Sequence, residues 1–174
     1  MTNARLYYMT RYLIPVFLLF LCFFMPVQIY IIGDGIGAGV QGAFYRYQGT
    51  SYGTSFITVC QDVQYVISGT YGGRTALSVL VWVIGDITLV ITTILALIMD
   101  QNPDDRRSTL IYSLLIMSGV LFLISAQLQY GLWLYGAAGI TIPFGVILMI
   151  SAGWYFKTMK DTVFAEVSTS TLKR

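Results

Sequence analysis

One acidic side chain, Asp86, lies in the middle of an apolar run, Ala76–Met99, and is the strongest chemical signal in the sequence. The run contains no Lys or Arg that could neutralise its carboxylate. An ionised carboxylate inside a membrane is costly by several kcal/mol. We therefore expect one of three roles for Asp86: a protonated, hydrogen-bonded clasp, a partner for a basic residue of another chain, or a carrier of protons or cations.

Other polar residues are spaced to join Asp86 in one intramembrane polar site. On a helix, Ser78 and Thr93 share a face with Asp86, because residues three or four positions apart lie on the same side. Gln127, in a later apolar run, is the nearest candidate partner in depth. The predicted site therefore consists of Asp86, Thr93, Ser78 and Gln127.

The residues that are missing limit the chemistry of the chain. It contains no histidine, which excludes His-ligated haem, His-based zinc sites and His-dependent triads. Its two cysteines, Cys22 and Cys60, are isolated, and we expect free thiols. Gly85-Asp86 shares two residues with the GxGD signature of intramembrane aspartyl proteases, but the first glycine and a second aspartate in another pass are absent. We predict a protein that is not an enzyme and has no cofactor or metal.

Composition indicates an integral membrane protein, because charged residues make up only 10% of the chain and mean hydropathy is +0.72. A helix needs about 20 mainly apolar residues to cross the roughly 30 Å hydrocarbon core. Four such passes are predicted, so the expected fold class is an all-α, four-transmembrane-helix bundle with a small extracellular loop domain. The predicted segments are a cytoplasmic N-terminus (1–11), a first pass (12–32), the extracellular loop domain (33–75), a second pass (76–99), a cytoplasmic loop (100–108), a third pass (109–130), a short extracellular turn (131–136), a fourth pass (137–156) and a cytoplasmic tail (157–174).

The distribution of basic residues sets the expected orientation. Lys and Arg near membrane helices concentrate on the cytoplasmic side. Eight basic residues fall on one predicted side and two on the other, so we expect both termini in the cytoplasm. The expected location is the plasma membrane. The larger group is Arg5, Arg11, Arg106, Arg107, Lys157, Lys160, Lys173 and Arg174, against Arg46 and Arg74.

The loop 33–75 is expected to form a small sheet. Alternating residues predict a strand over Phe56–Ile67, with Val40–Gln48 as its partner. The stretch Val59–Ile67 also fits a helix, because Val59, Val63, Val66 and Ile67 fall at i, i+4, i+7 and i+8.

Small residues recur every seven positions in two of the passes and predict close helix packing. They are Ser118 and Ser125 in the third pass and Ala138, Gly145 and Ala152 in the fourth. We expect these two passes to pack as an antiparallel pair, with a seam facing another subunit as the alternative.

Four passes, a long first outer loop with expected strands and a very short second loop resemble the layout of claudins and related tetraspan proteins. The claudin loop signature, a Trp followed by Gly-Leu-Trp and two cysteines, is missing from Gly33–Thr75, which has no Trp and only Cys60. Gly131-Leu132-Trp133 lies in the other turn. The resemblance therefore implies a layout and no functional residue.

The expected function is that of a non-enzymatic accessory, assembly or contact subunit that acts through its helix faces and outer loop. Its expected partners are the lipid bilayer and either further copies of the chain or another membrane protein, and no nucleic acid. The alternative is an oligomeric transporter or channel component that uses Asp86 for proton or cation handling.

Overall fold

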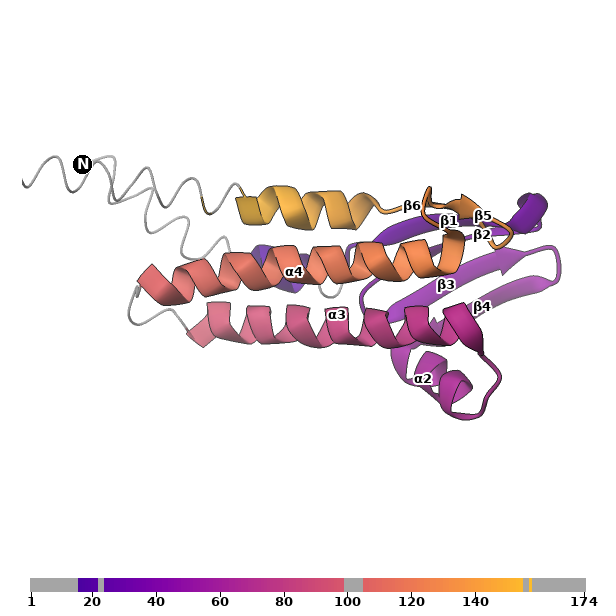
Figure 1. Ribbon diagram of the computed structural model, residues 1–174, viewed down its shortest axis with the longest axis horizontal. Coiled ribbons are helices and arrows are strands. Elements are labelled where there is room, and N and C mark those ends of the chain that lie inside the picture. Colours follow the sequence, from indigo (N-terminus) through magenta and orange to yellow (C-terminus); the bar gives the residue numbers. More distant parts are fainter. Residues whose placement is uncertain (1–15, 22–23, 99–104, 155–156, 158–174) are drawn as a thin grey trace, which may run out of the picture.

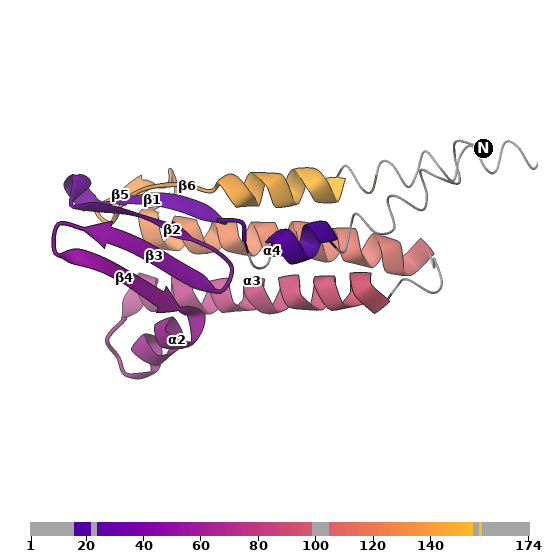
Figure 2. The same cartoon turned by 180° about the vertical axis from the view of Figure 1, so that it is seen from behind.

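The protein combines an antiparallel sheet with two long helices that cover one of its sides (Figures 1 and 2). The computed structural model describes residues 16–21, 24–98, 105–154 and 157. The six strands are arranged in the order β4-β3-β2-β1-β6-β5. Their bounds are β1 Gln28–Ile32, β2 Gly37–Gln41, β3 Tyr45–Thr50, β4 Gly53–Thr58, β5 Tyr135–Gly136 and β6 Gly139–Ile142. The helices are residues 16–21, the short 3-10 helix η1 (Gly33–Gly35), α2 (Val59–Ile67), α3 (Gly73–Ile98), α4 (Asp105–Tyr130) and Phe144–Trp154.

The prediction of an all-α four-helix bundle is wrong, because the fold is mixed α and β. The predicted first pass, 12–32, ends in strand β1, and the predicted fourth pass, 137–156, begins with strand β6. These two strands pair antiparallel, with Ile29 opposite Ile142. Both strands are rich in β-branched residues, which favour strands, and Pro26 and Pro143 separate them from the neighbouring helices because proline lacks the N–H that a helix interior requires.

Two helices are long and apolar enough to span a membrane, and they coincide with the second and third predicted passes. They are Gly73–Ile98 and, within α4, Thr109–Tyr130. Within the described residues, the helix Phe144–Trp154 is apolar but shorter. At 1.5 Å per residue this described part is about 16 Å long, and Lys157 beyond it is also helical.

Several predicted segments lie wholly or partly outside the described residues. They are the N-terminus and the start of the first pass (1–15), Cys22, the last residue of the second pass (99), part of the cytoplasmic loop (100–104), the end of the fourth pass (155–156) and the tail beyond 157.

The predicted loop domain, 33–75, forms the 3-10 helix η1, three strands and the helix α2, and α3 begins at its end. The strand expected over Phe56–Ile67 ends at Thr58, and the alternative interpretation, a helix over Val59–Ile67, is correct. A capping box explains the change: the Gln61 backbone N–H donates to the Thr58 hydroxyl, and the Thr58 backbone N–H donates to the Gln61 side chain at 2.8 Å. This reciprocal pair satisfies donors that the first turn of a helix leaves free.

The sheet turns its polar side toward the helices. In β1, Gln28 and Tyr30 are buried, whereas Ile29 and Ile31 are exposed. The register places Gln41 opposite Gln28 and Arg46 opposite Gln41, so these polar residues share the inner face. We call the opposite side the free face of the sheet; its large side chains are Ile29, Ile31, Ile140, Ile142, Tyr45, Tyr47 and Phe56.

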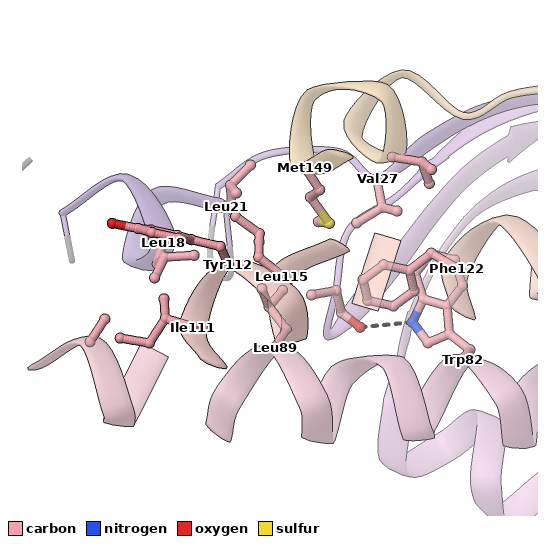
Figure 3. Close-up of a cluster of buried hydrophobic side chains, with 13 residues drawn as sticks. Leu18, Leu21, Val27, Trp82, Leu89, Ile111, Tyr112, Leu115, Phe122 and Met149 are labelled. Atoms are coloured by element: carbon pink, nitrogen blue, oxygen red, sulfur yellow. Dashed lines mark hydrogen bonds between the residues drawn. The ribbon is translucent and has the colours of Figure 1, made fainter. Parts of the chain in front are cut away.

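The core lies where the two long helices meet the sheet and the helix of residues 16–21 (Figure 3). Leu18 and Leu21 enter from that helix, and Leu89 and Leu115 come from α3 and α4. Trp82 ties the sheet to α3, because its indole N–H donates to the Ala43 carbonyl at 2.9 Å. Its ring also packs on Phe122, with centroids 4.6 Å apart. The sheet and the helices therefore share one core.

Ser118 and Ser125 lie at a helix interface, but their partner helix is α3. The Ser118 hydroxyl donates to the Gly85 carbonyl at 3.0 Å, and Ser125 and Ser78 bond reciprocally, each hydroxyl reaching the other residue's carbonyl at 2.8 Å. The predicted pairing of these serines with the fourth pass is therefore wrong. Small serines allow this close approach, and their hydroxyls find partners in the facing backbone.

Gly119 and Gly153, rather than the predicted stripe of Ala138, Gly145 and Ala152, bring α4 close to the helix Phe144–Trp154. A side chain at Gly119 would meet Ile150, and one at Gly153 would meet Ile116 and the Tyr112 carbonyl. Gly145 instead faces the chain that enters β1, and Ala138 lies in the β5–β6 hairpin, where its carbonyl accepts from Gly33 N–H. Ala152 packs against the core. The seven-residue spacing of Ala138, Gly145 and Ala152 therefore does not mark one interface.

Replacing Gly145 with alanine tests the close approach of the helix Phe144–Trp154 to the residues that precede β1. A Cβ atom at Gly145 would lie 2.7 Å from both the Pro26 carbonyl oxygen and the Val27 Cα, which are backbone atoms that cannot move aside alone. We expect Gly145→Ala to lower stability by about 1–3 kcal/mol. Gly72→Ala is the control, because nothing lies within 4 Å of its added Cβ. Equal thermal unfolding of both variants in detergent would contradict the packing.

Candidate functional site

The most polar part of the interior is a charged cluster between β3, α2 and the loop that precedes α3. The Arg46 guanidinium contacts an Asp62 carboxylate oxygen at 2.5 Å and the Tyr71 hydroxyl at 2.9 Å. Side chains of the ion pair are only 12% and 9% exposed. The strand alternation points Arg46 inward, and the Thr58 capping box begins α2 so that Asp62 falls in its first turn. Two local signals thus bring the charges together.

The surroundings keep Arg46 charged. Burial alone would lower its pKa, but the adjacent Asp62 carboxylate and Tyr71 hydroxyl outweigh burial and raise the pKa above the ordinary arginine value. A buried cation of this kind needs its anion, because an unpaired buried charge is strongly destabilising. The cluster therefore fastens α2 to the sheet.

A chain of neutral hydrogen bonds continues across the inner face of the sheet. Gln28 donates to the Gln41 side chain at 2.7 Å, and the Thr141 hydroxyl donates to Gln28 at 3.3 Å. Tyr30 donates to Gln48 at 3.2 Å. These bonds satisfy the polar side chains on the inner face of the sheet. Buried polar groups without hydrogen bonds would destabilise the fold.

A small cavity adjoins the charged cluster. Its lining includes Arg46, Asp62, Ser78, Trp82 and Gln129, and its volume is about 10 Å³. This is about the space that one water molecule requires. The Arg46 Nε atom has no hydrogen-bond partner within the described part of the chain. The cavity thus suits a bridging water rather than a substrate.

Asp86 lies one helical turn further along α3 than Trp82 and is 3% exposed. Neither carboxylate oxygen has a hydrogen-bond partner among residues 16–21, 24–98, 105–154 and 157. The predicted clasp to Ser, Thr or Gln is therefore not formed by the described residues. Asp86 is instead a buried acid without a hydrogen-bonding partner there.

The residues predicted to join Asp86 are engaged elsewhere. Ser78 bonds to Ser125, the Thr93 hydroxyl donates to the Leu89 carbonyl at 2.8 Å, and Gln127 donates to the Leu132 carbonyl at the end of α4. Ser78, Thr93 and Asp86 do share the buried side of α3, as helical spacing predicted. Gln127 does not bond to Asp86, because it lies close to the turn that follows α4.

Other hydroxyls of α3 also bond within their own helix. Thr88 donates to the Ile84 carbonyl and Thr92 to the Thr88 carbonyl, at 2.8 and 2.7 Å. Such i−4 bonds satisfy a hydroxyl locally. The threonines on the polar side of α3 therefore bond within their own helix and Ser78 bonds to α4, so these groups do not form a connected relay through Asp86.

The described residues contain no group of three or more His, Cys, Asp or Glu side chains that could hold a metal ion. Cys60 is a free, exposed thiol. Comparison of the chain with protein-family models, curated proteins and solved structures gives no match. The geometry of the chain itself therefore carries the functional argument.

Sequence reasoning missed the Arg46–Asp62 pair, although two signals pointed to it. The pattern Thr58-x-x-Gln61 is a capping box, which places Asp62 in the first turn of a helix. Gln41 and Arg46 fall at inward positions once Ile29 and Ile31 are recognised as outward. The second signal was missed because Ile29 and Ile31 were assigned to the first membrane pass, 12–32, rather than to a strand.

Removing one charge of the pair tests its role in holding α2. We expect Asp62→Asn to destabilise the protein by about 3 kcal/mol, because Arg46 would remain buried without its anion. The double variant Arg46→Met/Asp62→Leu should recover most of that loss, since neither charge remains. Chemical unfolding in detergent measures both. Additive losses in the double variant would contradict a coupled pair.

Proposed function

We propose that this chain is a non-enzymatic membrane protein that serves as an accessory, assembly or contact component. In this proposal α3 and α4 anchor it in the bilayer, and an aromatic strip on the free face of the sheet docks a protein partner, either a second copy or another membrane protein. The observation that carries the proposal is this uncharged, exposed strip on β3 and β4.

The strip consists of Tyr45, Tyr47 and Phe56. Tyr47 and Phe56 are direct cross-strand neighbours, 45% and 59% exposed, and Tyr45 stacks on Phe56 with centroids 5.8 Å apart. Stacking holds the rings in place before a partner arrives, which reduces the ordering cost of binding. Aromatic residues are enriched at the centres of protein interfaces, so the strip suits a protein contact.

Support for the membrane anchor comes from the exposed sides of the two long helices. On α3, Ile84, Ile87, Ile91 and Ile94 are each about half exposed and recur at three- or four-residue spacing. An apolar stripe of this kind matches the acyl chains of a bilayer better than it matches water. The proposed location is the plasma membrane. Both termini are proposed to be cytoplasmic, which rests on the distribution of basic residues in the sequence.

The interior favours this contact role over catalysis. Arg46, Asp62 and the buried glutamines of the sheet bond to one another. The adjoining cavity is about the size of a water molecule. These polar groups therefore serve the fold, and the exposed aromatic groups are the ones available to a partner.

Removing the aromatic strip tests the proposed contact. We expect native mass spectrometry of the protein in lipid nanodiscs to detect an assembly, and Tyr47→Ser/Phe56→Ser to weaken it at least tenfold. Ile67→Ser is the matched control, because Ile67 is 80% exposed and lies on α2, away from the strip. A wild-type protein that is always monomeric, or equal losses in both variants, would contradict the proposal.

Asp86 favours a second candidate, an oligomeric transporter or channel component that handles protons or cations. A buried acid without a partner in the described residues is unusual, and intramembrane acids often mark ion pathways. This alternative predicts proton or cation flux in liposomes that Asp86→Asn abolishes while assembly persists. Absence of flux in the wild type, together with normal assembly of Asp86→Leu, would exclude it.

A further inference from the structure

Strands β1 and β6 expose four isoleucines on the free face of the sheet. Ile29, Ile31, Ile140 and Ile142 are 42%, 48%, 42% and 60% exposed and form two cross-strand pairs. Their neighbours Tyr30 and Thr141 are buried on the inner face. Strands that face lipid show this alternation, in which polar residues point inward and apolar residues point outward.

This apolar surface continues directly into a helix. β6 ends at Ile142, Pro143 follows, and the helix Phe144–Trp154 begins. The helix exposes Phe144, Ile147 and Trp154 at 48%, 59% and 67%. The exposed apolar residues therefore extend from the helix onto the strand without an intervening charged residue.

The described part of β6 and the following helix, Gly139–Trp154, is about as long as a bilayer core is thick. Eleven helical residues at 1.5 Å each extend about 16 Å, and the four residues of β6 at about 3.4 Å each add roughly 13 Å. The total is about 30 Å, the thickness of a hydrocarbon core. Trp154 at one end and Tyr135 at the other are exposed aromatic residues of the kind found at both membrane interfaces.

The β5–β6 hairpin and the helix Phe144–Trp154 pack along α4, beside its apolar span Thr109–Tyr130. Near one end, a Cβ at Gly153 would lie 3.3 Å from the Tyr112 carbonyl oxygen. At the other, a Cβ at Gly136 would lie 2.6 Å from the Tyr130 carbonyl oxygen. The segment thus runs antiparallel to α4 within the length of its span, Thr109–Tyr130.

The backbone of these strands meets the main requirement of a lipid environment, which is that polar groups pair internally. β1 is paired on both sides, with β2 and β6. The other edge of β6 is covered by β5, and the Thr141 N–H donates to the Leu134 carbonyl at 3.0 Å. Neither strand presents a free edge over this stretch.

We propose that the free face of β1 and β6 contacts the acyl chains of the bilayer, so that strand β6 and the helix that follows it cross the membrane together beside α4. This inference rests on the membrane anchor of the proposed function. The lipid contact ends before the opposite edge of the sheet, because Gln61 and Gln64 of the adjoining α2 are exposed and polar. The bilayer boundary therefore crosses the sheet obliquely.

Site-directed spin labelling in liposomes tests this placement. Single cysteines at Ile142 and Ile31 would be labelled in a Cys22→Ala/Cys60→Ala background, and nitroxide accessibility to oxygen and to a water-soluble nickel chelate would be compared. Ile91→Cys on α3 is the reference for lipid, and Gln64→Cys on α2 is the reference for water. We expect both strand sites to match Ile91→Cys, with oxygen accessibility several-fold above nickel accessibility.

The references separate two kinds of failure. If Ile91→Cys is itself open to the nickel chelate, the membrane anchor of the proposed function fails. If Ile91→Cys is in lipid but the strand sites match Gln64→Cys, only the present inference is overturned. Low accessibility of the strand sites to both reagents would also overturn it, because a second copy or another protein would then cover the isoleucines.

Discussion

The structure depends on one constraint: the sheet buries its polar face, so every polar side chain on that face needs a partner inside the fold. Gln28 meets this constraint through Gln41 and Thr141, and Arg46 through Asp62. The Arg46 pair draws α2 onto the sheet. Because successive residues of a strand face opposite sides, the neighbours of these buried polar residues, such as Ile29 and Tyr47, point outward, which sets the surfaces on which both functional proposals rest.

The helices complete the interior through a few close contacts. Gly85 is pressed against Phe122, Trp82 donates to Ala43, and Ser78 and Ser125 bond reciprocally. Within this arrangement Asp86 lacks a hydrogen-bond partner in the described part of the chain. Polar groups elsewhere in the fold are mostly engaged in holding elements together, which favours a contact or assembly role. Asp86 is the exception that keeps proton or cation handling as a second candidate.

The sequence allowed the long apolar helices and the shared side of Ser78 and Asp86 to be predicted, because both follow from local periodicity. Strands β1 and β6 could not be recognised in the same way. Their residues are apolar throughout the predicted passes, and strand pairing between residues more than 100 positions apart leaves no local pattern. The Arg46–Asp62 pair could have been predicted, since the Thr58 capping box places Asp62 in a helix and the strand alternation, with apolar residues outward, places Arg46 inward. Hydropathy did not reveal these two signals, because an apolar strand and an apolar helix have similar mean hydropathy.

The pairing of β1 with β6 is the central claim, and engineered disulfides test it directly. Opposite residues of antiparallel strands have Cβ atoms about 5 Å apart, which suits a disulfide after small adjustment. Ile29→Cys/Ile142→Cys, in a background lacking Cys22 and Cys60, should crosslink rapidly under mild oxidation in membranes. The out-of-register pair Ile29→Cys/Ile140→Cys should crosslink much more slowly. Equal rates for the two pairs, or no crosslinking of the first, would contradict the strand pairing and with it the helix–strand crossing.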